Sequence, residues 1–212
     1  MRRIIVLIAV AAIVVAAVVL GVLVATSGSS HNASAAESAR AFVTAWKRSL
    51  EGTWTVEGTS VRAGLRDSVK ISQRPPDRLV RRGQAVSGTV NGRDVSCVVD
   101  PTGEVRCHDG GAARAYATTA AQQVADLTSE VGGPAPLYLV SDDGGGCFGL
   151  RLALVVAAPP YGQSARFCFD ATTGAPTLQQ REVDGVIDQE SFPTVSPAVT
   201  ETALSLPAPL EK

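Results

Sequence analysis

The residues whose chemistry is easiest to assign are the four cysteines, Cys97, Cys107, Cys147 and Cys168. An even number of cysteines in an exported domain usually forms disulfides, and four allow three pairings. Cys97 and Cys107 lie in two β-rich segments that a Pro-Thr-Gly loop joins. If these segments form a hairpin, the two cysteines lie directly opposite each other. We therefore predict a Cys97–Cys107 bridge and, by elimination, a Cys147–Cys168 bridge.

The second bridge sets a condition on the loop between its cysteines. A tight turn over residues 159–162 would place Cys168 opposite Ala153, so the bridge requires a longer loop or a bulge. Zinc is the alternative for Cys107 and His108 with the other thiols, but the chain has no C-x2-C pair. We predict four structural cysteines and no metal site.

Catalytic chemistry has little support. The two histidines are His31, in a polar tether, and His108, and neither belongs to a Ser-His-Asp pattern with a nucleophile elbow. Residues 142–146 (Asp-Asp-Gly-Gly-Gly) lack the spaced oxygen ligands of a calcium loop and indicate a hairpin turn. The sequence predicts a non-enzymatic protein with no catalytic residue and no cofactor.

A basic cluster is the remaining group with binding chemistry: Arg74, Arg78, Arg81 and Arg82. These side chains could contact anionic lipid headgroups near a membrane surface, at about 1 kcal/mol for each contact. The alternative is an ordinary solvated surface. The sequence alone leaves both interpretations open.

The N-terminus indicates where such chemistry would operate. The 22 residues from Ile4 to Ala25 carry no charge, and as a helix of about 33 Å they match a hydrocarbon core of about 30 Å. Arg2 and Arg3 precede them, and no further basic residue occurs before Arg40. The positive-inside rule then predicts a single-pass cell-membrane protein with a cytoplasmic N-terminus and an extracytoplasmic domain.

Three segments follow from this interpretation: a transmembrane signal anchor over 1–25, a flexible small-residue linker over 26–36 and a domain over 37–210. The alternative is a cleaved secretory signal with 33–35 (Ala-Ser-Ala) as its cleavage site, although its apolar region should span only about 7 to 15 residues. Both interpretations export the domain.

Composition limits the partners and the domain count. The 212 residues include 19 Lys and Arg against 20 Asp and Glu, so the formal charge of −1 argues against a nucleic-acid partner. About 177 residues remain beyond residue 35, which suffices for one domain with a real core.

The elements expected in that domain are two helices and a set of short strands. Apolar residues recur at helical spacing over 36–50 and again over 117–131. Asn91-Gly92 and Asp184-Gly185 predict two-residue hairpin turns between alternating β-rich segments. The pattern predicts an α+β domain with an antiparallel sheet of about eight to ten strands.

The order of these elements resembles the LolA-like superfamily of lipoprotein carriers, RseB-type sensors and mycobacterial lipid-binding lipoproteins. The matching phrases are RPPDRL at 74–79, the strand-Asp-Thr-Gly-Pro pattern at 167–176, and 138–140 leading into 147–152. The carriers of this superfamily are soluble and the mycobacterial members are acylated, whereas this chain is expected to be anchored by a helix. It would therefore be a membrane-anchored member, of actinobacterial type.

The resemblance implies a fold class and a function. The expected fold is α+β, with an N-terminal transmembrane helix followed by a large curved antiparallel sheet, a half-open β-barrel, covered by two helices. Such a sheet encloses an apolar pocket for acyl chains, and a filled core is the alternative. The residues expected to line the pocket are Phe42, Trp46, Trp54, Leu79, Tyr138, Leu150 and Leu152.

Two functions remain open at this stage. The first is a membrane-anchored extracytoplasmic binding protein for lipid or lipidated ligands. The second is an RseB-like regulatory module that docks on a partner protein of the envelope through edge strands or loops. Both are non-enzymatic.

Overall fold

The computed structural model describes residues 34–211, and its compact unit is Ser38–Lys212. The predicted membrane anchor and most of the predicted linker lie outside the described residues.

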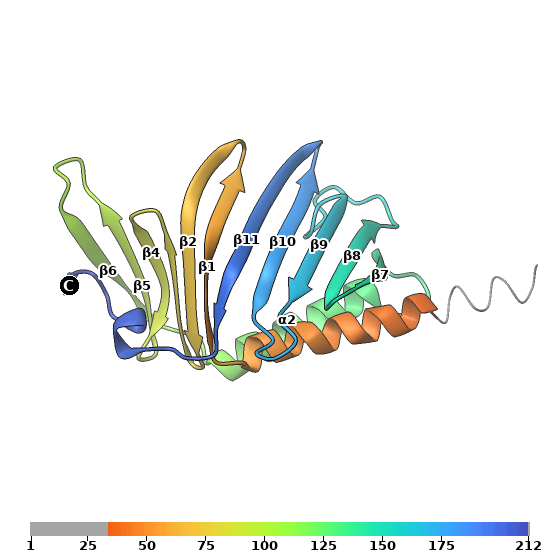
Figure 1. Ribbon diagram of the computed structural model, residues 1–212, viewed down its shortest axis with the longest axis horizontal. Coiled ribbons are helices and arrows are strands. Elements are labelled where there is room, and N and C mark those ends of the chain that lie inside the picture. Colours follow the sequence, from red (N-terminus) through yellow and green to blue (C-terminus); the bar gives the residue numbers. More distant parts are fainter. Residues whose placement is uncertain (1–33, 212) are drawn as a thin grey trace, which may run out of the picture. The chain divides into compact units, whose positions relative to one another are not determined.

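Strands make up most of this unit (Figure 1). A first helix covers residues 34–51, and a second, α2, spans Tyr116–Val131. A short 3-10 helix, η1, covers Glu201–Leu204. The strands are β1 Trp54–Arg62, β2 Leu65–Arg74, β3 Asp77–Arg82, β4 Ala85–Val90, β5 Arg93–Val99, β6 Val105–Ala112, β7 Tyr138–Gly144, β8 Cys147–Leu152, β9 Ser164–Phe169, β10 Pro176–Val183, β11 Val186–Ser196 and β12 Leu210–Glu211.

All twelve strands belong to one sheet, in the order β12-β6-β5-β4-β3-β2-β1-β11-β10-β9-β8-β7. β1 to β6 form one antiparallel meander and β7 to β11 form a second, because strands that are consecutive in sequence are neighbours in each half of the sheet. The two meanders meet where β1 pairs with β11. Residue pairs 57/194 and 59/191 flank a register shift at this seam. The local turns therefore build two halves, and one non-local pairing joins them.

The predicted fold class is wrong. The structure is mostly one large open sheet of twelve strands with two α-helices in the described part, and not a half-open barrel behind a transmembrane helix. Its end strands, β12 and β7, stand at opposite ends of the order and do not pair with each other. No helix within residues 34–211 is long and apolar enough to cross a membrane.

The sheet has more strands than the eight to ten expected. Pro75 and Pro76 form the turn between β2 and β3. The two-residue strand β12 has no sequence signal, because its parallel pairing with β6 depends on a C-terminal segment returning to the first meander.

Both helices lie where the apolar spacing predicts them, and Figure 1 shows them running across the strands. The C-terminal end of the first helix is fixed to the sheet by two side chains. Gln73 Nε2 donates to the carbonyls of Ser49 (2.7 Å) and Leu50 (3.0 Å), and Trp54 Nε1 donates to Ser49 (3.0 Å). These bonds satisfy carbonyl groups that a helix end otherwise leaves without partners.

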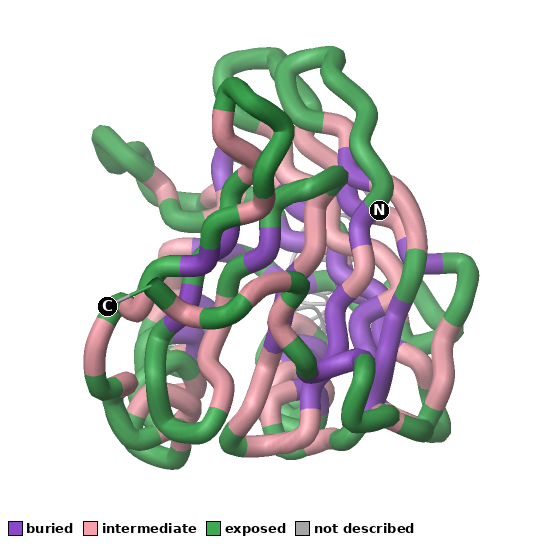
Figure 2. The backbone as a smooth tube through the Cα atoms, turned by 90° about the vertical axis from the view of Figure 1, so that its left-hand side faces the viewer, coloured by how far each residue is buried: buried purple, intermediate pink, exposed green. Residues whose placement is uncertain are grey.

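The two sides of the sheet are covered by different parts of the chain. One side packs against the helices, in a cluster that includes Phe42, Leu127, Tyr138 and Phe167. The opposite side of β3–β6 packs against the C-terminal segment, which contributes Leu204. Figure 2 shows the resulting pattern, with buried segments inside the strands and exposed hairpin tips.

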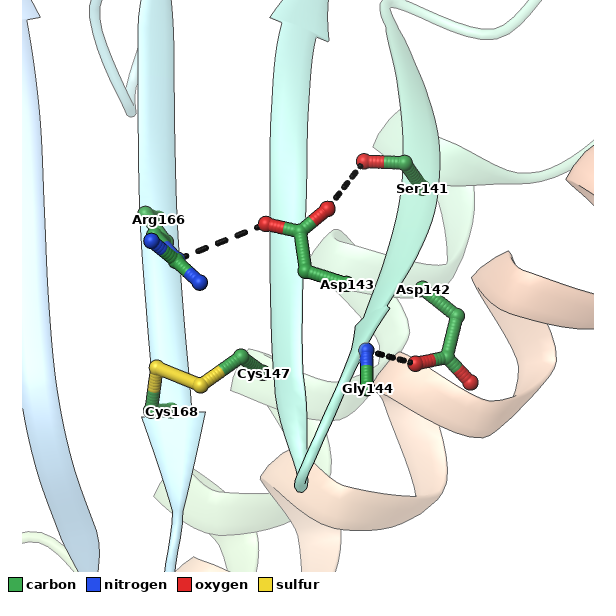
Figure 3. Close-up of a disulfide and its surroundings, with 7 residues drawn as sticks. All are labelled: Ser141, Asp142, Asp143, Gly144, Cys147, Arg166 and Cys168. Atoms are coloured by element: carbon green, nitrogen blue, oxygen red, sulfur yellow. Dashed lines mark hydrogen bonds and ion pairs between the residues drawn. A yellow bond between two sulfur atoms is a disulfide. The ribbon is translucent and has the colours of Figure 1, made fainter.

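Local turn signals proved accurate. Asn91 and Gly92 have φ values of 53° and 72°, and Asp184 and Gly185 have 51° and 78°, as two-residue hairpin turns require. Residues 145–146 form the hairpin turn between β7 and β8, and the acidic residues before it belong to the end of β7 (Figure 3). There the Asp142 carboxylate accepts from the Gly144 amide at 2.8 Å.

Both predicted disulfides are confirmed. Cys97 and Cys107 are paired directly across β5 and β6, and Cys147 lies opposite Cys168 on β8 and β9 (Figure 3). The second bridge has the longer loop it requires, since residues 153–163 connect β8 to β9. Each bridge therefore links neighbouring strands of one meander.

The two disulfides should differ in their resistance to reduction. Cys97 and Cys107 are completely buried under the C-terminal segment, whereas Cys147 is only half-buried. Because thiol–disulfide exchange requires access to the sulfur, a mild thiol reductant should open Cys147–Cys168 first. Alkylation followed by peptide mass spectrometry measures the order. Earlier labelling of Cys97 and Cys107 would contradict this assignment of burial.

Candidate binding cavity

A cavity of about 410 Å³ lies on the helix-facing side of the sheet and spans the seam between the two meanders. Residues of β1 to β4 line it on one side of the seam, and residues of β10 and β11 line it on the other. The first helix and the β8–β9 loop contribute a wall. The lining residues are Trp46, Arg62, Ile71, Arg78, Val80, Arg82, Ser87, Pro160, Tyr161, Phe167, Gln179, Arg181, Asp188, Gln189 and Glu190.

The wall of the cavity is aromatic. The ring centroids of Trp46 and Phe167 are 5.4 Å apart, and those of Tyr161 and Phe167 are 5.6 Å apart, both edge to face. The Nε1 atom of Trp46 is buried and has no hydrogen-bond partner among the described residues. The wall therefore presents mainly apolar ring surface to the cavity.

The floor of the cavity is charged, and Glu190 is its centre. Its carboxylate accepts from Arg82 Nη2 at 2.6 Å and from Arg62 Nη2 at 2.7 Å. Burial raises the pKa of Glu190, but the hydrogen bonds and charges of Arg82 and Arg62 outweigh burial and hold that pKa below its ordinary value. Glu190 is thus an ionised side chain that two arginines already neutralise.

Arg78 differs from these arginines. No carboxylate among the described residues lies within ion-pair distance of its guanidinium, and the guanidinium donates no hydrogen bond to them. Burial lowers the pKa of Arg78 below its ordinary value, and the neighbouring charge of Arg82 lowers it further. Arg78 is therefore a partly desolvated cation without an anion.

The charges that line the cavity do not balance. The four arginines are Arg62, Arg78, Arg82 and Arg181, and the two carboxylates are Asp188 and Glu190, which leaves a formal charge of +2. Arg181 Nη2 lies 4.0 Å from Asp188, at the limit of an ion pair. The cavity can therefore attract and hold a negatively charged group.

One of the seven predicted lining residues, Trp46, lies in this cavity. Phe42, Tyr138 and Leu150 are buried in the cluster between the helices and β7–β9, and Leu152 packs against that cluster. The remaining two lie elsewhere. Trp54 is buried in a central cluster, and Leu79 is buried on the opposite side of the sheet under the C-terminal segment.

The predicted basic cluster divides between the two sides of the sheet. Because side chains alternate along a strand, Arg78 and Arg82 of β3 line the cavity, whereas Arg81 faces the C-terminal segment. There Arg81 donates to the carbonyls of Ala203 and Ser205, both at 2.6 Å. Arg74 forms an ion pair with Glu201 at 2.7 Å. Half of the cluster therefore stabilises the C-terminal segment.

Several lining residues were missed by sequence reasoning, notably Arg62, Tyr161, Arg181 and Glu190. A signal for them exists in β10, which reads PTLQQREV and is polar on both faces although it occupies a central position in the sheet. A central strand normally has one apolar face. A polar central strand indicates that a polar cavity covers it.

A second cavity of about 340 Å³ lies between the first helix and the ends of β8 and β9. Its charged side chains have partners within the fold. Arg48 Nη2 donates to the Thr172 carbonyl at 2.6 Å, and Asp170 accepts from the Thr173 amide at 2.7 Å. This cavity therefore offers mainly apolar surface and no free charge.

The described residues contain no cluster of three or more histidine, cysteine or acidic side chains that could hold a metal ion. Tyr161 of the aromatic wall lies close to Glu130 of α2, whose Oε2 atom is buried without a hydrogen-bond partner among the described residues. Burial raises the pKa of both side chains. This pair supports the wall and offers no nucleophile to a ligand.

Comparison with known proteins adds no family assignment. A scan against protein-family models finds no match, and a search of curated proteins finds no relative. The functional argument therefore depends on the cavity.

Proposed function

We propose that this protein is an extracytoplasmic, non-enzymatic binding protein for a lipid or lipidated ligand, held in the cavity across the β1–β11 seam. The observation that carries the proposal is the pairing of an aromatic wall with a cationic floor in one cavity. An amphipathic ligand fits such a lining because its chain and its headgroup need opposite surroundings.

The dimensions and lining of the cavity favour this class of ligand. Its volume of about 410 Å³ falls within the range of about 300–1,000 Å³ typical of small-molecule sites. Ile71 and Val80 line the cavity on the sheet side but are almost fully buried, whereas Trp46 and Tyr161 are half-buried. We infer that an alkyl chain lies against the rings of Trp46 and Tyr161 while its polar end reaches the arginines.

The β8–β9 loop provides a route between the cavity and a lipid surface. Pro160 and Tyr161 of this loop line the cavity, and the same loop exposes the consecutive apolar residues Leu154, Val155 and Val156. Exposed apolar side chains that stand together are typical of surfaces that contact a membrane or another protein. We infer that this loop contacts the source of the ligand.

The two disulfides support the extracytoplasmic location, because such bonds persist in oxidising compartments and are rare in the cytosol. The apolar run over residues 4–25 supports export of the chain.

Co-purification of ligand tests the proposal. The full chain, produced in a membrane-containing host, should carry near-stoichiometric lipid in native mass spectrometry, and solvent extraction should identify that lipid. Ser87→Trp places a large ring in the cavity and should lower the bound lipid severalfold. A chain with no bound lipid that also refuses added amphiphiles would contradict the proposal.

Ser96→Trp is the matched control. Ser96 is the cross-strand partner of Ser87, is exposed like Ser87 and does not line the cavity. It should retain lipid, so equal loss from both variants would indicate a general packing defect.

A second candidate function is docking on a partner protein of the envelope, and the exposed residues 154–156 favour it. Val155→Asp separates the candidates. It should abolish capture of a partner if docking is the function, but leave lipid already held in the cavity unchanged.

A further inference from the structure

We propose that the cavity recognises a phosphate headgroup, which Arg78 binds with support from Arg82. This inference rests on the proposed function, because it names the chemical class of the ligand that the same cavity holds. Two separate features of the lining carry it: an arginine without an anion and an excess of positive charge.

The first feature is the absence of an anion for Arg78 within the described residues. Glu190 cannot serve, because Arg62 and Arg82 already occupy its carboxylate at 2.7 and 2.6 Å. Asp188 accepts from the Ala63 amide at 3.3 Å and lies next to Arg181. A half-buried guanidinium presents five donors in a fixed planar fork, which matches the oxygens of a phosphate.

The second feature is charge. Four arginines and two carboxylates give the lining a formal charge of +2. A phosphate monoester carries a charge of about −1.5 to −2 near neutral pH, so it neutralises the lining almost completely. A neutral headgroup would leave this charge uncompensated in a partly enclosed site.

The experiment compares two ligands that share one alkyl chain, dodecyl phosphate and 1-dodecanol, each titrated into the full chain and followed by native mass spectrometry. Wild-type protein should bind dodecyl phosphate at least about tenfold more tightly, as expected for charge-assisted hydrogen bonds. Arg78→Met should abolish this preference while dodecanol binding stays within about twofold.

The melting temperature of Arg78→Met shows whether this variant is folded. Because it removes a desolvated cation that has no counter-ion, its melting temperature should equal or exceed that of wild type. Arg66→Met is the matched control, since Arg66 is an exposed arginine of β2 outside the cavity and its loss changes the net charge equally. The control should keep the phosphate preference.

Three results would overturn the inference: equal affinity of wild type for both ligands, a preference that survives in Arg78→Met, or an equal loss in Arg66→Met. A thermal-shift series with inorganic phosphate against chloride at matched ionic strength separates the two proposals. If neither alkyl ligand binds but phosphate raises the melting temperature of wild type and not of Arg78→Met, the lipid function fails and the phosphate site stands. No response to any ligand would overturn both.

Discussion

Replacing Gly58 with alanine should destabilise the protein by about 3 kcal/mol, because the new methyl group has no space at the seam of the sheet. A Cβ atom at Gly58 would overlap the backbone carbonyl oxygen of Ser191 on β11. Gly58 lies between the residue pairs that flank the register shift of β1 against β11. Neither strand can move away without breaking the ladder that joins the meanders.

Urea unfolding of Gly58→Ala, followed by circular dichroism, measures this loss. Thr59→Ala is the control, because Thr59 is the next residue of β1, is half-buried and loses side-chain atoms. It should cost less than about 1 kcal/mol. A Gly58→Ala variant as stable as this control would show that the seam is more adaptable than the structure indicates.

The same variant should lose ligand. Both meanders contribute charged residues to the cavity lining. Arg62 and Arg78 belong to the first meander, and Arg181 and Glu190 belong to the second. The geometry of the cavity therefore depends on the β1–β11 pairing. Bound lipid in Gly58→Ala should therefore fall even under conditions where both meanders remain folded. This links the stability of one backbone contact to the function of a site composed of both halves.

The seam also explains which part of the fold the sequence could predict. Helices and hairpins follow from local signals, such as Asn91-Gly92 or the apolar stripe around Phe42, and these were found correctly. The pairing of β1 with β11 joins residues more than a hundred positions apart. Its specificity comes from packing and from Gly58, which no local pattern reveals. The half-open barrel was expected from the resemblance to the LolA-like superfamily, and the single open sheet shows that this expectation was wrong.

The candidate site was harder to predict than the fold. Large apolar residues were predicted to line the pocket, but most of them are buried in the core, because large apolar side chains are the ones that folding most often buries. The cavity is lined by residues that the core cannot use, such as Arg78 and Glu190. Alternation along β3 then placed Leu79 and Arg78 on opposite sides of the sheet. Knowing which side the helices cover required the structure.

Glu190→Gln should change stability and ligand affinity in opposite directions. The substitution removes the anion that Arg82 and Arg62 share, so two guanidinium groups lose their counter-ion. For a fully buried pair such a loss costs about 3–5 kcal/mol. Since Arg62 and Arg82 are partly exposed, we expect about 2 kcal/mol, and a melting temperature lower by about 6 °C.

The stability difference between wild type and Glu190→Gln should depend on pH. The folded state holds the pKa of Glu190 below its ordinary value of 4.5, so the carboxylate stabilises the fold fully above that value. This contribution is lost as the pH falls through the folded-state pKa. The melting temperatures of the two proteins should therefore differ at neutral pH and converge as the pH is lowered through the folded-state pKa of Glu190. A constant difference would show that Glu190 acts by shape and not by charge.

Ligand affinity should respond in the other direction. Removing one carboxylate raises the formal charge of the lining from +2 to +3 and releases Arg62 and Arg82 for the ligand. Dodecyl phosphate should then bind on the order of tenfold more tightly, while 1-dodecanol should bind as before. A misfolded variant cannot gain affinity for one of two ligands that share an alkyl chain. Tighter phosphate binding by a less stable protein would therefore demonstrate that the lining balances fold stability against anion binding. Weaker phosphate binding would contradict the assignment of the headgroup to the charged floor of the cavity.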